Sequence, residues 1–476
     1  METRKVDVAI IGAGSAGLAA RRAAVERGAS VVLIEDGPYG TTCARVGCMP
    51  SKLLIAAADV AHEVAGAGRF GIRVDGVRVD GAAVLARVRA ERDRFVGFVV
   101  DSVEALPAGE RLRGRARFLA PTTLAVGDAL RVEARAVVIA SGSSPTRPPS
   151  LDAVRDRVLV NDDIFALTEL PASLAVVGTG TVGLEIGQAM HRLGVHTAFF
   201  SHSERLGPLT DPQVHAAAVR VFGAELDLHP NAALSSVPDG AGVLMRWQER
   251  NGQVRQERFD FVLAATGRRP NLGDLGLEQA RVALDERGVP RFDPRTMQCG
   301  DAPIFLAGDA SDYRPVLHEA ADEGTLAGAN AARYPGVRAE IRRAPLTIAF
   351  TDPNLAVVGE PFAALDPDLI EIGAVSYDDQ GRARVMGRNA GHVRIYGRRD
   401  DGTLLGAEML GPRVEHTAHL LAWAVQQQMT VLQALEMPIY HPVIEEGIRS
   451  ALRDLCARLK LRPPENKREL ECGPGT

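Results

Sequence analysis

The chain contains 476 residues, which is too long for one ordinary hydrophobic core and indicates roughly two to four domains. Its net charge is −5, 24% of its residues are charged, and no basic run stands out. These values argue against a nucleic-acid or acidic-surface partner. No run approaches the roughly 18 apolar residues that a membrane span needs, and residues 1–5 lead into a predicted strand without an apolar signal core. We therefore expect a multidomain globular protein of the cytoplasm with no membrane segment.

The start of the chain predicts a strand, a glycine-rich turn, a helix and a second strand. These elements are the strand Val6–Ile11, the turn Gly12–Gly17, an Ala-rich helix to Arg27 and the strand Ser30–Glu35. Gly12, Gly14 and Gly17 allow a tight turn and a close approach of the backbone to a pyrophosphate at the helix N-terminus. Glu35 lies 18 residues past Gly17, where a carboxylate accepts hydrogen bonds from a ribose. We predict a dinucleotide site here, the alternative being a glycine-rich turn that binds no nucleotide.

Two cysteines, Cys43 and Cys48, follow this unit with four residues between them. In an ideal helix their Cα atoms would lie roughly 7.5 Å apart, which is beyond disulfide reach. A disulfide therefore needs a distorted turn, for which Gly47 and Pro50 provide a place before an Ala-rich helix predicted over 53–65. In a reducing compartment a close pair indicates redox or metal chemistry. We favour redox chemistry and expect no metal, because no CxxC motif or histidine stands nearby to complete tetrahedral coordination.

The first pattern recurs in the middle of the chain. Its elements are the strand Leu174–Val177, the turn Gly178–Gly183, a helix through Arg192 and the strand Val195–Phe200. Two such loops are far less expected by chance than one, so Gly178, Gly180 and Gly183 indicate a second dinucleotide.

The second loop lacks the ribose carboxylate of the first, because the residue 18 positions past its last glycine is Ser201. This hydroxyl is neutral, whereas the nearby His202 and Arg205 are able to meet a 2′-phosphate. The residues alone therefore leave the choice between NAD and NADP open.

Two apolar strands end in loops that contain glycine. The stretch 136–141 closes into Gly142, and the stretch 261–265 runs through a threonine into Gly267. Both stretches are typical of the exits from a domain, and both glycines are candidate cofactor-binding positions.

A further buried strand, predicted over 304–308, ends in the carboxylate of Asp309 and precedes a predicted helix over 318–332. After Pro345 the glycine loops stop. Alternating segments followed by a predicted helix over 414–429 indicate an α+β domain at the end of the chain.

With both loops, the cysteine segment and the Asp309 strand, the chain resembles the flavoprotein disulfide reductases over nearly its whole length. The family pattern is glycine-threonine-cysteine, four residues and cysteine, followed by proline and lysine, and Gly40 here precedes both cysteines in register. The stretches 207–212 and 441–446 are most similar to the dihydrolipoamide dehydrogenase branch. The resemblance implies an α/β fold with two Rossmann-like dinucleotide-binding domains and a C-terminal α+β dimerisation domain.

The expected domains are a split FAD-binding domain, an NAD(P)-binding domain and an interface domain. Their expected bounds are 1–147 and 271–344 for FAD, 148–270 for NAD(P) and 345–476 for the interface. The resemblance implies FAD on the first loop and a nicotinamide nucleotide on the second, on opposite faces of one isoalloxazine. Asp309 would bind the ribityl chain, and Lys52 and Glu185 match positions near the flavin. The candidate cofactor-binding residues are Gly12, Gly14, Gly17, Glu35, Lys52, Gly142, Asp309, Gly178, Gly180, Gly183, Glu185 and Gly267.

The resemblance also assigns the catalytic groups. Cys43 would be the interchange thiol, and Cys48 would face the flavin. His441 would be the base that takes the proton of a substrate thiol, with Glu446 fixing its tautomer. Val443 replaces the usual threonine of the family's histidine-proline-threonine motif. In the family this histidine crosses from the partner subunit, so the active site requires a homodimer.

The branch implies oxidation of a dihydrolipoyl dithiol with NAD⁺ through FAD and a Cys43–Cys48 disulfide. NAD is favoured from the branch alone, and NADP stays open. The alternatives are an NAD(P)H-dependent reductase of another disulfide, such as a glutathione-like one, or of Hg(II), and a flavoprotein subunit without turnover. Cys299 and Cys456 are expected to be structural thiols, and Cys472 a single thiol in a flexible tail without the second cysteine of a redox pair.

Overall fold

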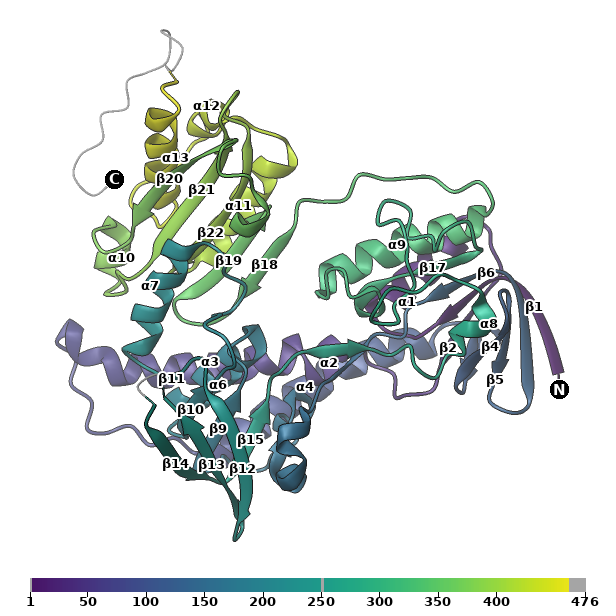
Figure 1. Cartoon of the computed structure of the whole chain (residues 1–476), viewed down its shortest axis with the longest axis horizontal. Coiled ribbons are helices and arrows are strands. Elements are labelled where there is room, and N and C mark those ends of the chain that lie inside the picture. Colours follow the sequence, from purple (N-terminus) through teal and green to yellow (C-terminus); the bar gives the residue numbers. More distant parts are fainter. Residues whose placement is uncertain (1, 250–251, 462–476) are drawn as a thin grey trace. The chain divides into compact units, whose positions relative to one another are not determined.

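The computed structural model describes residues 2–249 and 252–461, and the chain divides into two compact units (Figure 1). Unit 1 consists of Met1–Leu53, Ala86–Thr146 and Gly267–Arg342, and unit 2 of Leu54–Leu85, Arg147–Thr266 and Arg343–Thr476. Two long helices, α3 (Cys48–Gly66) and α4 (Gly81–Glu104), contribute residues to both. Within the described ranges, no helix has the length and apolar character needed to cross a membrane.

Unit 1 is built on a seven-stranded sheet in the order β3-β2-β1-β6-β5-β4, with β17 also paired to β6. Pairing is parallel among β1, β2, β3, β6 and β17, and antiparallel for β4 and β5. The strands are β1 (Glu2–Ile11), β2 (Val31–Glu35), β3 (Arg111–Arg113), β4 (Ala116–Ala120), β5 (Thr123–Val126), β6 (Leu130–Ile139) and β17 (Ile304–Leu306). The predicted α/β class is confirmed for this unit.

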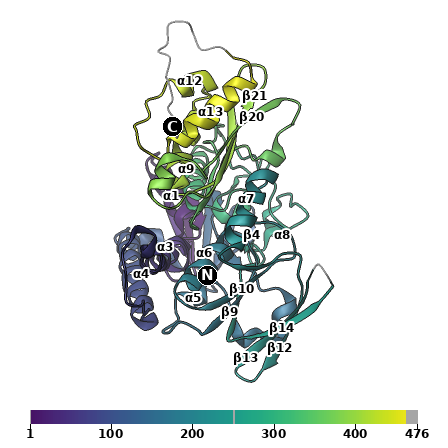
Figure 2. The ribbon, with the colours of Figure 1, turned by 90° about the vertical axis from the view of Figure 1, so that its left-hand side faces the viewer.

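Alternate residues of β1 pack into two separate hydrophobic cores, because successive side chains of a strand point to opposite faces of the sheet. Val8 and Ile10 pack into the core that contains residues of α1 and α9, whereas Ala9 and Ile11 pack into the core beneath β4 and β5. The helices of this unit are α1 (Ser15–Val25), α2 (Thr42–Val46), α8 (Leu277–Ala280) and α9 (Leu317–Arg333). Figures 1 and 2 show α1 and α9 side by side.

The contact between α1 and α9 is close because α9 has glycine at the crossing. A Cβ atom on Gly324 would lie 2.1 Å from the carbonyl oxygen of Ala16, and one on Gly328 would lie 2.1 Å from that of Ala20. Neither distance is possible between non-bonded atoms, so these positions require glycine. The helix that follows the first glycine loop is thereby held tightly against α9.

Unit 2 contains a parallel sheet that carries the second glycine loop. Its strand order is β11-β10-β9-β15-β8, and an antiparallel sheet β12-β13-β14 accompanies it. The strands are β8 (Val158–Leu159), β9 (Ser173–Val177), β10 (His196–Phe200), β11 (Asp227–His229), β12 (Ala233–Asp239), β13 (Gly242–Gln248), β14 (Val254–Phe259) and β15 (Phe261–Ala264). The helices are α5 (Asn161–Ile164), α6 (Thr181–Arg192) and α7 (Pro212–Gly223).

The last part of unit 2 is the predicted α+β domain. Its antiparallel sheet has the order β18-β19-β22-β21-β20, and the buried residues of α11 and α13 share one core with it. The strands are β18 (Leu346–Ala349), β19 (Asn354–Gly359), β20 (Ile370–Ser376), β21 (His392–Arg398) and β22 (Leu404–Gly411). The helices are α10 (Gly381–Val385), α11 (Val414–Gln426), α12 (Val431–Leu435) and α13 (Glu446–Arg458). The helix predicted over 414–429 therefore ends three residues earlier.

The two predicted domain exits pair with each other. Strand β7 (Ser143–Pro145) follows Gly142, strand β16 (Arg268–Pro270) follows Gly267, and the two strands form an antiparallel ribbon in unit 1. The chain therefore leaves unit 1 and returns to it at one place. The expected domain bounds remain a prediction.

Gly324→Ala is expected to destabilise the protein, because the added Cβ would force α9 away from α1. Overpacking of this kind typically costs about 1–3 kcal/mol, so we expect a clear fall of the urea midpoint. The matched control is Gly97→Ala in α4, whose added Cβ meets no heavy atom within 4 Å and should leave the midpoint equal or slightly raised. Equal midpoints for wild type and Gly324→Ala would contradict the close-packing argument.

Candidate active site

The two cysteines lie on either side of a break between two helices. Cys43 belongs to α2, and Cys48 is the first residue of α3. Gly47 between them has φ −120° and ψ −116°, far from helical values, and a Cβ there would lie 3.2 Å from the Cys43 Cα. The distorted turn that the spacing predicts is therefore present. The following helix begins at Cys48 rather than at Leu53, because the break at Gly47 leaves the next residue free to start it.

The described cysteines, Cys43, Cys48, Cys299 and Cys456, are free thiols in the structure. The Cys43 side chain is partly buried, and that of Cys48 is exposed. The pKa of Cys43 is raised far above its ordinary value, first by a hydrogen bond with Cys48 and then by burial, while the charge of Lys52 acts in the opposite direction. A thiol in this state stays protonated near neutral pH, so its use as a nucleophile requires a base.

The other described thiols lie in cores. Burial raises the pKa of Cys299 to about 12, and it also raises the pKa of Cys456. Both are expected to be unreactive for this reason. Cys472 lies outside the described residues.

The first glycine loop connects β1 to α1 and has the shape that a pyrophosphate needs. A Cβ on Gly12, which has φ +105°, would lie 2.2 Å from the Ala140 carbonyl oxygen, and a Cβ on Gly17 would lie 1.8 Å from the Gly12 carbonyl oxygen. Gly14, the N-cap of α1, faces open space instead, because among the described residues beyond its chain neighbours no heavy atom lies within 4 Å of its Cβ position. Two glycines therefore close the turn, and the third leaves room for a ligand at the helix N-terminus.

Glu35 lies at the end of β2, next to this loop. Its two carboxylate oxygens accept the N–H groups of Ala13 and Gly37, each at 2.8 Å. These bonds fix the carboxylate and leave lone pairs for ribose hydroxyls. The buried hydroxyl oxygen of Ser141 has no hydrogen-bond partner among the described residues, and Ser141 adjoins Gly12. The loop and its carboxylate thus fit the adenosine and pyrophosphate of FAD.

Asp309 follows β17 in a 3₁₀ turn (Gly308–Ser311) and has partners that the sequence did not predict. Its Oδ2 accepts the Ser143 hydroxyl at 2.7 Å, and Arg268 donates to the same hydroxyl oxygen at 2.8 Å and lies 3.9 Å from the carboxylate. The carboxylate is about one quarter exposed and can still accept hydroxyl groups of a ribityl chain. The only sequence signal was that Ser143 and Arg268 each follow a predicted exit glycine.

A buried carboxylate lies behind the Asp309 turn. Glu323 on α9 has no exposed surface, and its Oε2 accepts the Gly308 N–H at 2.8 Å and the Ser311 hydroxyl at 3.3 Å. Arg342 lies 3.4 Å from its other oxygen and also pairs with Glu319. Burial raises the pKa of Glu323 to about 7, although the charge of Arg342 opposes the rise.

The second loop, between β9 and α6, repeats the geometry of the first. A Cβ on Gly178 would lie 2.3 Å from the Ala265 carbonyl oxygen, one on Gly183 would lie 1.9 Å from the Gly178 carbonyl oxygen, and Gly180 faces open space. These residues fit a second dinucleotide. Glu185 follows on α6, where its Oε1 accepts the Phe350 N–H at 2.8 Å.

The specificity position of the second loop is Ser201, which follows β10. It is buried, and its hydroxyl donates to the Ser203 carbonyl oxygen. His202 and Arg205 are exposed, and the Arg205 carbonyl accepts the Thr179 hydroxyl of the glycine loop. The choice between NAD and NADP therefore stays open.

His441 and Glu446 form a pair in unit 2. His441 Nδ1 lies 2.8 Å from Glu446 Oε1, and the Val443 N–H donates to Glu446 Oε2 at 3.1 Å. The Glu446 side chain is buried at the start of α13, whereas 68% of the His441 side chain is exposed. A carboxylate on Nδ1 favours the proton there and leaves Nε2 as the accepting atom. The Val443 departure keeps this arrangement, because the backbone N–H supplies the bond.

The predicted site residues therefore lie in two sets. Unit 1 carries the cysteine pair, the first loop with Glu35, and Asp309, together with Gly142 and Gly267. Unit 2 carries the second loop with Glu185 and the histidine–glutamate pair. Lys52 lies one turn past Cys48 on the same face of α3. The sequence missed Ser143, Arg268 and Glu323.

The buried Glu323 predicts a pH-dependent stability. Its folded pKa of about 7 exceeds the 4.5 of a free side chain, so between these values the folded state holds a proton that the unfolded state has lost. The free energy of unfolding therefore falls by ~3 kcal/mol as the pH rises from the pKa of the unfolded state to that of the folded state. Glu323→Gln should remove that part of the fall in urea midpoints measured from about pH 5 to about pH 8, whereas exposed Glu340→Gln should keep it. An unchanged pH profile in Glu323→Gln would show that this carboxyl does not titrate there.

Two family models match the chain. The model described as pyridine nucleotide-disulphide oxidoreductase matches residues 6–324, and the dimerisation-domain model of that family matches residues 346–452. A dihydrolipoyl dehydrogenase of Bacillus subtilis (strain 168) is 30% identical over 461 residues, covering 94% of this chain and 97% of that protein. A mercuric reductase of Acidithiobacillus ferrooxidans is 31% identical over 470 residues, covering 96% of this chain and 84% of that protein.

Solved structures agree with these matches. The crystal structure of LpdA from Mycobacterium tuberculosis has a TM-score of 0.80 at 25% sequence identity, with 95% of this chain and 99% of that chain covered. The HOCl-induced flavoprotein disulfide reductase RclA from Escherichia coli has a TM-score of 0.76 at 22% identity, which shows a shared fold. The chain therefore belongs to the pyridine nucleotide-disulphide oxidoreductase family, whose members are FAD-dependent, bind NAD(P) and carry a dimerisation domain.

Proposed function

We propose that this chain is a dihydrolipoyl dehydrogenase, which oxidises a dihydrolipoyl dithiol with NAD⁺. The observation that carries the proposal is the hydrogen-bonded thiol pair Cys43 and Cys48, held on either side of Gly47. Such a pair, when oxidised, would form the redox disulfide that a dithiol substrate exchanges with. The similarity to the Bacillus subtilis dihydrolipoyl dehydrogenase over almost the whole of both chains supports the choice of substrate.

The first loop, Glu35 and Asp309 are the groups that would hold FAD, with Lys52 and Gly142 beside it. The second loop, Glu185 and Gly267 would hold the nicotinamide nucleotide. Bound FAD would supply a two-electron acceptor for the dithiol pair and pass a hydride equivalent to the nucleotide. The glycine geometry of both loops fits this division, because each leaves one open helix N-terminus for a pyrophosphate.

The chemistry of the protein groups is thiol–disulfide exchange. The reaction starts with Cys43 and Cys48 joined in a disulfide. A substrate thiol gives its proton to His441 Nε2, and the resulting thiolate attacks Cys43 Sγ. The Cys43–Cys48 bond breaks, and its electron pair goes to Cys48 Sγ. The second substrate thiol then attacks the substrate sulfur in the mixed disulfide, which forms the cyclic product and leaves Cys43 as a thiol. The substrate loses two electrons, and the protein pair gains them.

The raised pKa of Cys43 favours the protonated Cys43 that the second exchange step leaves. The first step needs a base for the substrate thiol. His441 suits that role, since Glu446 holds its Nδ1 and its ring is largely exposed. In the proposed dimer this histidine serves the cysteine pair of the partner subunit, so a monomer would lack the base. The dimerisation domain in the chain supports a homodimer.

A second candidate is reduction of Hg(II) or of another disulfide, favoured by the 31% identity to the Acidithiobacillus mercuric reductase. Residues 457–476 contain a single cysteine, Cys472, so this stretch offers no second thiolate to share a soft metal ion such as Hg(II). This feature favours the dithiol reaction over the mercuric one.

A substrate panel tests the proposal. Purified holoenzyme should turn over dihydrolipoamide with NAD⁺ faster than with NADP⁺, and should act weakly on oxidised glutathione or Hg(II) with NADH or NADPH. Cys43→Ser should abolish dithiol turnover and keep bound flavin, and the control Cys299→Ala should keep both. Preferred turnover of Hg(II) or glutathione would overturn the substrate, and turnover by Cys43→Ser would remove Cys43 from the mechanism.

His441→Gln should slow dithiol turnover by about 10²- to 10⁴-fold near neutral pH, because the substrate thiol then loses its general base. The remaining rate should rise with pH as the thiol ionises by itself. Glu446→Gln should have a smaller effect of the same kind, because the ring stays but its tautomer is less fixed. A wild-type pH–rate profile in His441→Gln would show that another group is the base.

A further inference from the structure

One face of α6 holds an extended segment of the chain through side-chain hydrogen bonds. Glu185, Gln188 and Arg192 lie three and four residues apart, so they share a helix face, and all three side chains are buried. They face Phe350 and Asp352, which follow strand β18 directly. All of these residues belong to unit 2.

The contacts follow the two-residue period of an extended chain. The Phe350 N–H donates to Glu185 at 2.8 Å, and two residues later the Asp352 N–H donates to Gln188 Oε1 at 2.9 Å. The Gln188 amide nitrogen donates back to the Asp352 carbonyl at 2.8 Å. The side chains of α6 therefore pair with this segment in the way that a neighbouring strand would.

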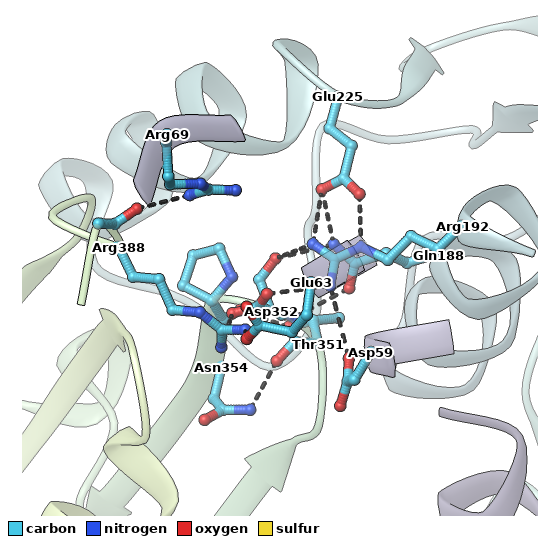
Figure 3. A network of polar contacts seen from close by, with 12 residues as sticks. Asp59, Glu63, Arg69, Gln188, Arg192, Glu225, Thr351, Asp352, Asn354 and Arg388 are labelled. Carbon is cyan, nitrogen blue, oxygen red and sulfur yellow. Dashed lines mark hydrogen bonds and ion pairs between the residues drawn. The ribbon is translucent and has the colours of Figure 1, made fainter. Parts of the chain in front are cut away.

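Arg192 completes the face, and its side chain is only 4% exposed. Its guanidinium lies among Glu225, Asp352 and Asp59 (Figure 3). Nε and Nη2 bind both carboxylate oxygens of Glu225 at 2.6 and 3.1 Å. Nη1 and Nη2 bind the carboxylate and the carbonyl oxygen of Asp352, each at 3.0 Å. Asp59 on α3 lies 3.5 Å away. A planar fork with five donors matches this arrangement, and an ammonium group does not.

A second cation closes the cluster. Arg388 lies 3.4 Å from the other carboxylate oxygen of Asp352 and pairs with Glu63 on α3 (Figure 3). Asp352 is therefore held at its N–H, its carbonyl and both carboxylate oxygens. Hydrogen bonds act only at set distances and angles, so these contacts fix the backbone of Asp352 more narrowly than apolar packing would.

The position of this cluster suggests more than stability. Buried ion pairs add little net stability over apolar packing, but they can specify one arrangement. The fixed segment supplies the N–H that holds Glu185, and Glu185 follows the second glycine loop by two residues. The Glu185 carboxylate must keep one orientation if a bound nicotinamide ring is to contact it in the same way in every catalytic cycle.

We propose that Gln188 and Arg192 are positioning residues for the second nucleotide site. They fix the segment Phe350–Asp352, this segment fixes the Glu185 carboxylate, and the carboxylate shapes the pocket of the nicotinamide nucleotide. The inference rests on the proposed placement of that nucleotide at the second loop, and it does not depend on which disulfide or dithiol is the substrate.

The test measures flavin reduction by NADH and by NADPH in the holoenzyme, with no disulfide substrate present. The dependence of the rate on nucleotide concentration separates the apparent Kd from the limiting rate. Arg192→Met should raise the apparent Kd by ~10-fold, with a smaller change in the limiting rate. Gln188→Met should act in the same direction, and Arg192→Lys should be intermediate, because it keeps the charge and loses the fork.

A double-mutant cycle shows whether Arg192 acts through Glu185. If it does, Arg192→Met should change the apparent Kd by less than about twofold in a Glu185→Gln background, since coupled residues are not additive. Full additivity, or an unchanged Kd in both Arg192→Met and Gln188→Met, would overturn the proposal. If Arg192→Met does not fold, Arg192→Lys and Gln188→Met carry the same comparison.

The control is Arg220→Met, which removes the same charge from an exposed position in the last turn of α7 and should leave the apparent Kd unchanged. Urea midpoints of all variants show whether an altered Kd merely follows lost stability, and such a correlation across the set would count against a positioning role. Wild-type flavin that neither nucleotide reduces would instead refute the proposed function itself.

Discussion

The fold depends on contacts between backbones that only glycine permits. In each of the two glycine loops, the last glycine lies directly against the carbonyl oxygen of the first, and the first lies against the end of a neighbouring strand. Gly324 and Gly328 allow an equally close backbone contact between α9 and α1. Strand, turn and helix are thus fixed as one rigid piece, and the open helix N-terminus that results is a ready site for an anion.

Most of the site that the sequence predicted is encoded by short spacing, although Glu35 was predicted from a position 18 residues past the first loop. The glycine loops, the break at Gly47 and the pairing of His441 with Glu446 each involve residues at most five positions apart. Such patterns have local physical causes, namely backbone conformation and reach of a side chain. The roles assigned to these residues remain predictions, because geometry alone does not identify a substrate.

The part that the sequence did not predict depends on long-range pairing. Ser143 meets Asp309 across 166 positions, and Arg192 meets Asp352 across 160. A single chain gives no pattern from which such partners can be read, since their meeting depends on the order of strands in the sheets. Glu323 was not predicted for the same reason. A glutamate on a predicted helix is ordinary, and this one is distinguished only by its hydrogen bond to the Gly308 turn.

The ribbon formed by β7 and β16 has a topological consequence. Because the two crossings of the chain hydrogen-bond to each other, the 122 residues between them form a loop whose ends are already joined. Closing such a loop costs little extra chain entropy however long it grows, since that cost rises only with the logarithm of length. Unit 1 can therefore accommodate an inserted stretch of this length at this point, in the manner of a domain inserted at a hairpin tip, without disturbing its own sheet.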